Sequence, residues 1–186
     1  MADDILTGGT ATASTTESGH PASDAVDDNL STRWNNNNSL PAWWKYDLGV
    51  GNSATPTYLC LYKVSYDQLK TFTLSGSNND VDWDELISDV VPPGLNVWRE
   101  YSFSNSTAYR YFKIDMPDSY SGTWVSIGEI ELYESTPIPD ARITHAVVEV
   151  LRAGDPDARI THAVVEVLRG VEPPSGDSMS NFFLLF

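Results

Sequence analysis

Residues 10–49 read TATASTTESGHPASDAVDDNLSTRWNNNNSLPAWWKYDLG, and this stretch is the starting point for the fold and the function. Its middle crowds oxygen-bearing side chains into one short loop around Asp27, Asn29 and Thr32. Such a loop suits a hard cation such as Ca2+, which takes six to eight oxygen ligands. The stretch also places aromatic residues beside polar loop residues, an arrangement that suits the apolar face of a sugar. It therefore favours a binding module over an enzyme.

Outward from this stretch, residues 10–134 alternate short β-branched and aromatic runs with clusters of Gly, Asn, Asp, Ser and Pro, and helical periodicity is nearly absent. Turns are expected at 49–52, 76–80 and 92–94. Many short strands at such spacing predict an antiparallel sandwich or barrel. The predicted strands are Trp43–Leu48, Tyr58–Tyr66, Lys70–Ser75, Val97–Phe103, Tyr109–Met116 and Val125–Tyr133.

The two ends of the chain differ from this central region. Residues 1–9 are expected to form a loose N-terminal arm, and the Pro-containing segment 135–139 is expected to be a linker. An identical fourteen-residue sequence, PDARITHAVVEVLR, then occurs at 139–152 and again at 156–169. The apolar C-terminus, 182–186, is too short to span a bilayer but could dock into a groove.

The secondary structure of the repeat is open on sequence grounds. Ile143, Ala146, Val147 and Val150 would share one face of a helix. However, the repeat is rich in Ile, Thr and Val, which favour strands, and the Ala-Gly-Asp-Pro sequence at 153–156 is typical of a turn. We therefore predict two strands that form a hairpin, which needs a partner surface because an isolated hairpin is marginally stable.

Composition limits the possible functions. The 186 residues fit one domain with an appendage, and the net charge of −15 disfavours binding to nucleic acid and to anionic lipid. No apolar run is long enough for a transmembrane helix, and the acidic N-terminus lacks a signal-peptide pattern. Cys60 is the only cysteine and lies in an apolar run, so we expect a buried structural thiol.

A series of short motifs in residues 10–134 resembles one known family. These motifs are, in chain order, Ala11–Ser14, Pro21–Asp27, Ser31–Trp34, Trp43–Gly49, Leu74–Asn78 with Trp83, Ala108–Ile114 and Ile127–Tyr133. Together they resemble the discoidin domains, also called coagulation-factor (F5/8) type C domains, and the related family-32 carbohydrate-binding modules. The resemblance implies an all-β, galactose-binding-like jelly roll of about eight antiparallel strands, to which the chain adds a strand-like repeat tail at 135–186.

The chain departs from the family pattern at a few points. Val26 stands where an aromatic residue is usual, and Asp28 stands where glycine is usual. The cysteines that staple many secreted discoidin domains are also missing. The chain is therefore closer to a microbial or viral carbohydrate-binding module than to an animal cell-surface domain.

The resemblance implies a structural cation below the first loop. Ca2+ is the expected ion because all the ligands are oxygens, and its role would be to clip the first loop to the last core strand. The alternative is a metal-free turn in which Asp27 accepts backbone hydrogen bonds. The implied ligands are the side chains of Asp27, Asn29, Thr32 and Glu129 and the carbonyl groups of Asp24 and Gly128.

The resemblance also implies a sugar site in the loops at one end of the sandwich. The segment 120–124 is the most attractive platform because it holds two aromatic residues in a Ser/Gly loop, although Trp124 could instead cap the sandwich. The candidate ligand-binding residues are His20, Asn35, Asn36, Asn37, Asn38, Tyr66, Tyr120 and Trp124.

Other conspicuous residues are expected to be structural. Arg33 and Asp47 lie in apolar contexts, where a charge is normally paired, so we expect a core ion pair or hydrogen-bond network. His145 and His162 occupy the same position in the two repeats, and repeated structure accounts for them better than a metal site. The residues expected to lie mostly in the core are Trp34, Trp43, Trp44 and Trp83.

No nucleophile elbow, zinc motif or phosphate loop occurs in the sequence, so we do not expect an enzyme. The repeat is similar to a segment recurrent in phage virion proteins. The sequence thus predicts a carbohydrate-binding module of a virion, such as a tail fibre, or of another extracellular surface assembly. It would attach the particle to glycans and bind copies of itself or other virion subunits through residues 135–186. The alternatives are a purely structural subunit and an accessory module of a secreted glycoside hydrolase.

Overall fold

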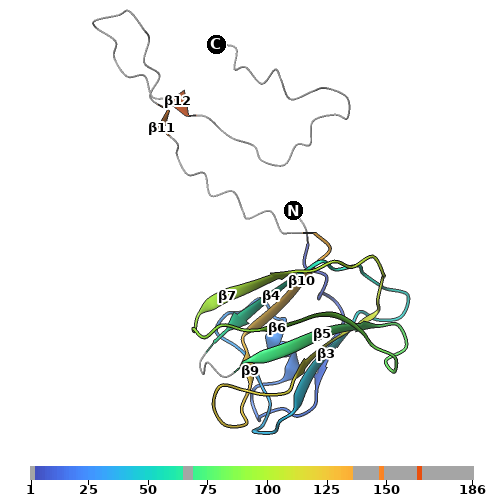
Figure 1. Cartoon of the computed structure of the whole chain (residues 1–186), viewed down its shortest axis with the longest axis vertical. Helices are drawn as coiled ribbons and strands as arrows, with labels where there is room; N and C mark the ends of the chain where they lie inside the picture. The colour runs from blue at the N-terminus through green and yellow to red at the C-terminus, as the bar shows by residue number, and fades with distance from the viewer. Residues whose placement is uncertain (1–2, 65–68, 136–146, 149–162, 165–186) are drawn as a thin grey trace, which may run out of the picture. The chain divides into compact units, whose positions relative to one another are not determined.

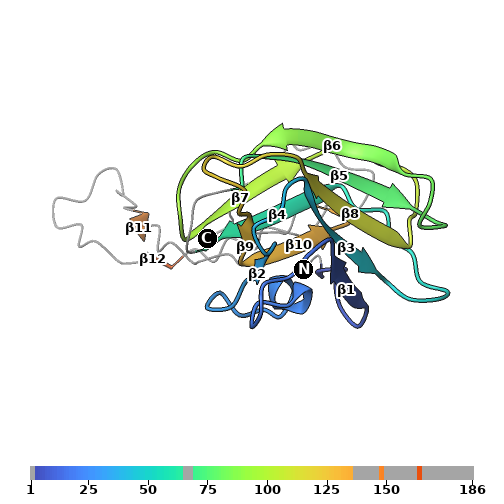
Figure 2. The same ribbon diagram turned by 90° about the horizontal axis from the view of Figure 1, so that it is seen from below.

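The computed structural model describes residues 3–64, 69–135, 147–148 and 163–164. The chain divides into two compact units, Met1–Pro137 and Ile138–Phe186. The first unit is an antiparallel β-sandwich with one short 3-10 helix (Figures 1 and 2). This confirms the predicted all-β, galactose-binding-like fold. Among the described residues, no helix is long and apolar enough to cross a membrane.

The sandwich contains a five-stranded sheet of order β1-β3-β8-β5-β6 and a three-stranded sheet of order β10-β4-β7, and a short pair, β2 with β9, lies beside them. A 3-10 helix, Ala22–Ala25, precedes β2. The strands are β1 Thr10–Ala13, β2 Trp34–Asn35, β3 Ala42–Asp47, β4 Tyr58–Lys63, β5 Thr71–Ser77, β6 Asp84–Val90, β7 Val97–Ser102, β8 Tyr111–Met116, β9 Ser126–Ile127 and β10 Glu129–Tyr133.

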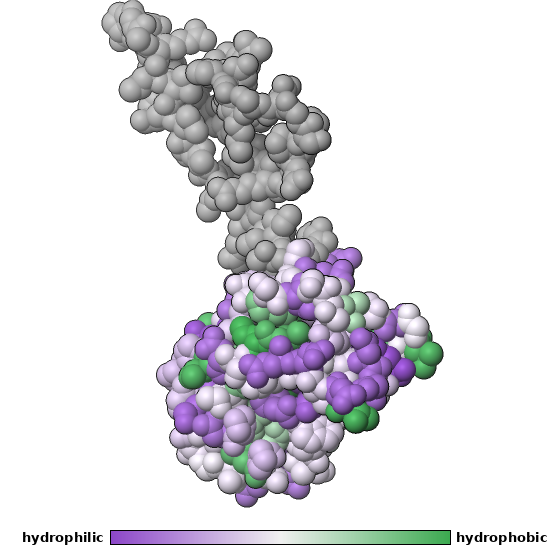
Figure 3. Space-filling model, turned by 45° about the vertical axis from the view of Figure 1, so that its right-hand side comes forward, coloured by the Kyte–Doolittle hydropathy of each residue, from purple (hydrophilic) through white to green (hydrophobic). Residues whose placement is uncertain are grey.

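The core forms where the inner faces of the sheets meet. Strand β3 illustrates how each strand contributes to this core: Ala42, Trp44 and Tyr46 are buried, while the residues between them are half-buried. This period of two is what an antiparallel strand with one covered face requires. The other large core side chains include Leu59, Leu61, Phe72, Leu74, Phe112, Ile114, Ile130 and Leu132. On the face of the domain that Figure 3 shows, hydrophilic residues are widespread and hydrophobic residues form small patches.

Three strands, β1, β2 and β6, were not among those predicted from the sequence. Strand β6 lies at an edge of the five-stranded sheet, and most of its residues are exposed, so it lacks a clear apolar alternation. Strand β1 consists only of Thr and Ala and pairs with β3. The predicted strand over 125–133 is interrupted at Gly128, where a Cβ atom would lie 2.6 Å from Val64 Cγ1.

The N-terminal segment is not a loose arm. The Ile5 amide donates to the Leu132 carbonyl (2.9 Å), and the Leu132 amide donates to Asp4 Oδ1 (2.8 Å). Leu6 is 2% exposed and belongs to the core. Residues 3–9 therefore run beside the edge of β10, and the burial of Leu6 helps to hold them there. The sequence pattern does not predict this burial, because the core that Leu6 joins consists of residues distant in sequence.

Four residues of the repeats are described. Val147–Val148 (β11) pairs in antiparallel fashion with Ala163–Val164 (β12). Val147 lies opposite Val164, which occupies the same position in the second copy of the repeat. For these residues the strand interpretation is confirmed. The linker, the C-terminal apolar tip, His145 and His162 lie outside the described residues, as does Tyr66.

Candidate functional site

The candidate ligand end of the sandwich is built around β2. Trp34 is fully buried, so the alternation of a strand directs Arg33 and Asn35 away from the core. Loop residues 17–20 run beside this strand, because the Glu17 amide donates to the Asn35 carbonyl (3.0 Å) and the Asn35 amide to the His20 carbonyl (3.5 Å). Four polar side chains distant in sequence are thereby brought to one place.

We call Glu17, His20, Arg33 and Asn35 the polar cluster. Asn35 Nδ2 donates to Glu17 Oε2 over 2.6 Å, and Arg33 Nη2 lies 3.2 Å from His20 Nε2. Because a guanidinium only donates hydrogen bonds, His20 Nε2 is the acceptor in this contact. Glu17 Oε2 is 4.0 Å from the same histidine nitrogen. The cluster thus presents both charges, together with donors and acceptors.

Several atoms of this region are buried and have no hydrogen-bond partner. They are Arg33 Nε, Asn35 Oδ1 and the hydroxyl oxygen of the neighbouring Thr15. A buried polar atom without a partner is costly, and native proteins normally satisfy such atoms with water, an ion or a ligand. The three atoms are a guanidinium donor, an amide acceptor and a hydroxyl that can act as either.

Asn36 has a different role from Asn35. Its side chain is completely buried and makes three hydrogen bonds, from Nδ2 to the carbonyls of Ser39 (2.6 Å) and Thr123 (2.9 Å) and from the Val125 amide to Oδ1 (2.9 Å). Asn36 thus holds the loop after β2 against the loop before β9. We assign it a structural role instead of the predicted ligand contact, because it has no exposed surface.

The two predicted aromatic platforms lie in the loop between β8 and β9. Trp124 is half-buried and lies between Thr123 and Val125, the two residues that the Asn36 side chain binds. It therefore borders the loop after β2. Tyr120 is 42% exposed and its hydroxyl donates to the Val91 carbonyl (3.1 Å). Lys63 Nζ lies 5.6 Å from the centre of the Tyr120 ring, and burial lowers the pKa of this lysine to about 8.

The remaining asparagines lie at the tip of this end. Asn37 and Asn38 are exposed and have positive φ angles, 29° and 55°, which asparagine tolerates better than most residues. The Asn38 side chain is hydrogen-bonded to the Thr123 hydroxyl. Asn37 is thus available to a ligand, while Asn38 helps to tie the two loops together.

Four of the predicted cation ligands, Asp24, Asp27, Asn29 and Thr32, lie in the turn 24–32, which we call the acidic turn, whereas Gly128 immediately precedes β10 and Glu129 begins it. Thr32 Oγ1 lies 2.9 Å from each carboxylate oxygen of Asp27, and the Asn29 amide donates to Asp27 Oδ1 over 3.0 Å. These bonds are the ones that a metal-free turn would use. They also place the Asp27 carboxylate, the Thr32 hydroxyl and the Asn29 carbonyl, which accepts from Thr32, within one small region.

Glu129 is the feature of the acidic turn that a metal-free arrangement leaves unexplained. Its side chain is 1% exposed, its carboxylate accepts from the Asp28 amide, and Oε2 has no hydrogen-bond partner. Burial, with the charges of Asp27 and Asp28, raises the pKa of Glu129 to about 8. Burial and the charge of Asp27 also raise the pKa of Asp24.

The residues present fit a hard cation, because the available donors are oxygens and a buried carboxylate oxygen lacks a partner. In the described part of the chain, no group of three or more His, Cys, Asp and Glu side chains is placed to hold a metal ion. A cation here would therefore be held by two carboxylates, Asp27 and Glu129, supplemented by hydroxyl, amide and carbonyl oxygens.

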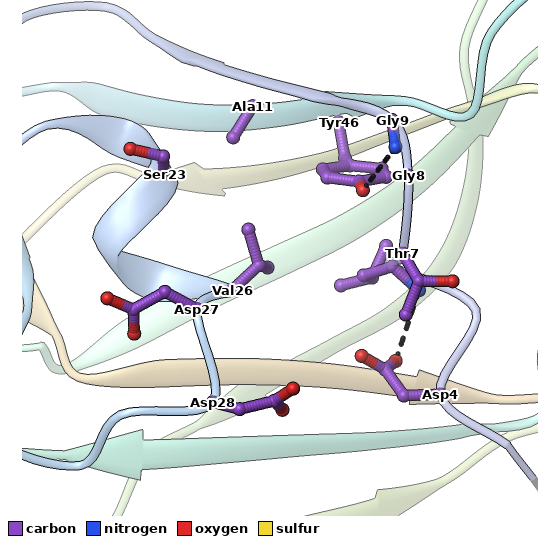
Figure 4. Close-up of a pocket in the computed structure, with 11 residues that line it drawn as sticks. Asp4, Thr7, Gly8, Gly9, Ala11, Ser23, Val26, Asp27, Asp28 and Tyr46 are labelled. Atoms are coloured by element: carbon purple, nitrogen blue, oxygen red, sulfur yellow. Dashed lines mark hydrogen bonds between the residues drawn. The ribbon is translucent and has the colours of Figure 1, made fainter.

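A cavity of about 380 Å³ lies beside the acidic turn, under the N-terminal segment (Figure 4). The Asp4 and Asp28 carboxylates point toward each other in it, and no basic residue is among the described residues that line it. Burial raises the pKa of Asp4 to about 6, and the charges of Glu131 and Asp28 add to the effect. The negative charge of the turn thus continues into the N-terminal segment.

The two charged residues expected to be structural have separate partners. The Arg110 guanidinium donates to both carboxylate oxygens of Asp47, over 2.7 and 2.8 Å, which lowers the pKa of Asp47. This ion pair is partly exposed and so is not in the core. Arg33, in contrast, belongs to the polar cluster. Among the tryptophans, Trp34 and Trp44 are buried, whereas Trp43 and Trp83 are half-buried and each has a lysine over its ring.

The model of the F5/8 type C domain family matches residues 10–130. The chain belongs to this family. Among curated proteins, none matches the chain. The fold and the family that the sequence motifs indicated are thereby confirmed.

Solved structures of family-32 carbohydrate-binding modules are similar to this domain. The module of AlyQ in complex with 4,5-unsaturated mannuronic acid is 27% identical, with a TM-score of 0.60, and the match covers 72% of this chain and 98% of that one. The module of Clostridium perfringens NanJ in complex with galactose is 21% identical, with a TM-score of 0.63 and the same coverage. At this identity, the similarity is evidence for a shared fold only. A truncated AlyQ with an alginate lyase domain is 27% identical (TM-score 0.58), with 71% of this chain and 32% of that one covered.

Sequence analysis missed two members of the polar cluster. Glu17 had no distinguishing local pattern, because its role depends on the pairing of its loop with β2. Arg33 was expected in a core ion pair or hydrogen-bond network; it contacts His20, but on the side of β2 opposite Trp34 and not in the core. The alternation around Trp34, a residue expected in the core, was the one signal that could have placed Arg33 and Asn35 together.

Proposed function

We propose that this domain is a non-catalytic carbohydrate-binding module whose ligand site is the polar cluster, with Trp124 as the adjacent platform. The observation that carries the proposal is the polar cluster itself, in which successive contacts of 2.6, 4.0 and 3.2 Å join an amide, a carboxylate, an imidazole and a guanidinium from two segments of the chain. Such groups donate to and accept from sugar hydroxyls. An aromatic ring beside them suits the apolar face of the pyranose.

The solved relatives support the ligand class. The AlyQ module was solved with an unsaturated mannuronic acid and the NanJ module with galactose. The polar cluster of this chain contains a carboxylate as well as a guanidinium, and the chain as a whole is strongly acidic. A neutral glycan therefore suits this site better than an acidic one.

The domain also includes, in this proposal, a structural Ca2+ in the acidic turn. Asp27, Asn29, Thr32 and Glu129 would supply side-chain oxygens, and Asp24 and Gly128 would supply carbonyl oxygens. The ion would supply positive charge beside Glu129, and no catalytic role is implied. The side chains themselves order the turn through Thr32 and Asp27, and Glu129 fixes its position relative to β10 through the Asp28 amide.

The tail is proposed to carry the module on an assembly, either a virion or another extracellular surface. The supporting observation is that equivalent residues of two identical repeats face each other in an antiparallel pair, as they could between two chains. Linked copies of a weak site gain avidity without new contacts. Removal of residues 135–186 should leave a folded monomer, and a truncated protein that still sediments as an oligomer would contradict this role.

A glycan array, with Ca2+ and again with chelator, tests the proposal directly. Asn35→Ala and Trp124→Ala should each weaken binding about tenfold, or about 1.4 kcal/mol. The matched control is Val50→Ala, because Val50 is 87% exposed in the turn after β3 and belongs to neither site. A folded protein that binds no glycan would favour a purely structural subunit. If the domain binds a glycan and the native polypeptide also carries a catalytic domain, the result would favour an enzyme accessory module, as in AlyQ.

A further inference from the structure

The outer face of the three-stranded sheet carries aromatic and acidic side chains in a regular arrangement. Leu59 and Leu61 of β4 point into the core, so the residues that alternate with them point outward. The register of the ladder then fixes which neighbours share this face. Nine positions of β10, β4 and β7 (strands labelled in Figure 1) lie on the side of the sheet away from the core: Glu129, Glu131, Tyr133, Tyr58, Cys60, Tyr62, Trp98, Glu100 and Ser102. Of these, Glu129 is buried under the acidic turn and Cys60 is buried between its neighbours.

Four of these nine residues are aromatic, and they lie in two cross-strand pairs. Tyr62 is opposite Trp98, with ring centroids 5.2 Å apart, and Tyr58 is opposite Tyr133. All four side chains are half-buried, so part of each remains exposed. Tyr58 and Tyr62 are four positions apart along β4, so the two pairs are about 13 Å apart at the rise of a strand. Exposed apolar surface that is contiguous marks a binding surface more often than single exposed residues do.

Two carboxylates lie between the aromatic pairs. Glu100 and Glu131 flank Cys60 on the two neighbouring strands. The Tyr58 hydroxyl donates to Glu100 Oε2 (2.6 Å) and the Tyr133 hydroxyl to Glu131 Oε2 (2.7 Å). These bonds hold each carboxylate beside a ring. Burial raises the pKa of the Cys60 thiol to about 12, and the charges of Glu131 and Glu100 contribute to the effect.

We propose that this aromatic face, made of Tyr58, Tyr62, Trp98, Glu100, Glu131 and Tyr133, is a second glycan site that binds an amino sugar chain with free ammonium groups. The inference rests on the proposed function in one respect, that the domain binds glycans. None of the nine outward residues is basic, and the chain carries a net charge of −15. Charge complementarity therefore selects a cationic ligand over a neutral or acidic one.

The layout of the face favours a sugar chain over a basic peptide. Aromatic pairs at both ends offer flat surfaces for the rigid faces of pyranose rings, and the carboxylates between them suit ammonium groups. An ammonium near the rings also gains from the cation–π interaction. The alternative is that the aromatic pairs only stabilise the sheet through cross-strand packing.

Calorimetric titration of the full-length protein at low salt, with a glucosamine oligomer, tests the proposal. The same oligomer in its fully N-acetylated form is the matched ligand control, because it keeps the rings and lacks the charges. We expect the glucosamine oligomer to bind at least about tenfold more tightly than the acetylated one. Trp98→Ala and Glu100→Gln should each weaken it by a similar factor. Glu100→Gln is the safer variant, because Glu100 is exposed and glutamine still accepts from Tyr58.

The control variant is Asp82→Asn, which removes one exposed charge outside this face and should leave the affinity unchanged. Equal affinity for both oligomers, or unchanged affinity in Trp98→Ala and Glu100→Gln, would overturn the proposal. Equally tight binding of a lysine oligomer would show a surface for basic peptides and would also overturn it. Amino sugar binding that is lost in Trp124→Ala but kept in Trp98→Ala would assign that ligand to the loop end, so the two sites can fail separately.

Discussion

The polar cluster and the acidic turn come from one short stretch of chain, but they differ in chemical balance. The polar cluster combines a carboxylate with a guanidinium, and its unpartnered atoms include a donor and an acceptor. The acidic turn contributes carboxylates, and its unpartnered atom, Glu129 Oε2, is an acceptor. The first arrangement suits a neutral molecule that both donates and accepts, whereas the second suits a cation.

Under the proposed function, the sequence separates a sugar site from a cation site within about twenty residues. Trp34 points into the core from β2 and is followed by Asn35 on the opposite side, which fixes the polar cluster. The turn before β2 instead faces Glu129 on β10. A change in β2 should therefore affect the sugar site most, and a change in the turn should affect the cation site most.

The largest effect is expected from Trp34→Ala, which should disturb both the polar cluster and the acidic turn. Trp34 is fully buried, pairs with Ile127 across β2 and β9, and donates from Nε1 to the Thr15 carbonyl. Loss of a buried tryptophan should lower the free energy of unfolding by about 3–5 kcal/mol. Denaturant unfolding followed by the remaining tryptophan fluorescence measures this. A loss below about 1 kcal/mol would mean that Trp34 is not the common support of the two regions.

Asp27→Asn should sharpen the comparison by affecting the acidic turn alone. Saturating Ca2+ should stabilise the wild-type protein by about 2.7 kcal/mol at a hundredfold excess over Kd. The variant should lose most of this gain, because one of its two carboxylate ligands is replaced by an amide. Thermal unfolding with Ca2+ and with chelator measures the gain, and Asp82→Asn is the matched control. An identical Ca2+ response in Asp27→Asn would place the ion elsewhere, and no response in the wild-type protein would support the metal-free turn.

The smallest effect is expected from Asp4→Asn, which tests whether the negative charge of the turn reaches the N-terminal segment. The pKa of Asp4 is raised to about 6 in the folded protein, so the folded state holds the proton more tightly than the unfolded chain. This contribution to stability is present at low pH and is lost as the pH rises from about 4 through about 6. Asparagine keeps the oxygen that accepts from the Leu132 amide.

The variant should therefore be more stable than the wild type at pH 7, by the order of 1 kcal/mol because Asp4 is partly exposed. The advantage should shrink as the pH is lowered to 4. Unfolding curves in chelator over this pH range check the expectation. A constant difference between variant and wild type across the range would exclude a role for the Asp4 charge.

Much of the fold could be predicted from the sequence, because the signals involved are local. The alternation in Ala42–Asp47 and the paired leucines of Tyr58–Lys63 define strands with one buried face. The edge strand Asp84–Val90 escaped prediction because a largely exposed strand needs no apolar alternation. The N-terminal segment was expected to be loose because its anchor, Leu6, is a single residue whose partners are distant in sequence.

The candidate site was predictable in composition but not in arrangement. His20, Asn35 and Trp124 were predicted as candidates from their loop context, and the proposed cation ligands followed from the family resemblance. The role of Asn36 could not be foreseen, because two identical residues in succession point in different directions and only one bridges to Thr123 and Val125. Glu17 became part of the site through the pairing of its loop with β2.

The sequence by itself determined the class of this protein: an acidic, all-β F5/8 type C domain followed by a repeated tail. It did so because strand periodicity, turn residues and ordered motifs are local or additive along the chain. Only the tertiary structure decided which polar groups meet, which of them are left without partners, and which aromatic residues share an outer face. Those outcomes depend on strand register and on burial, and both are set by contacts between residues far apart in the chain.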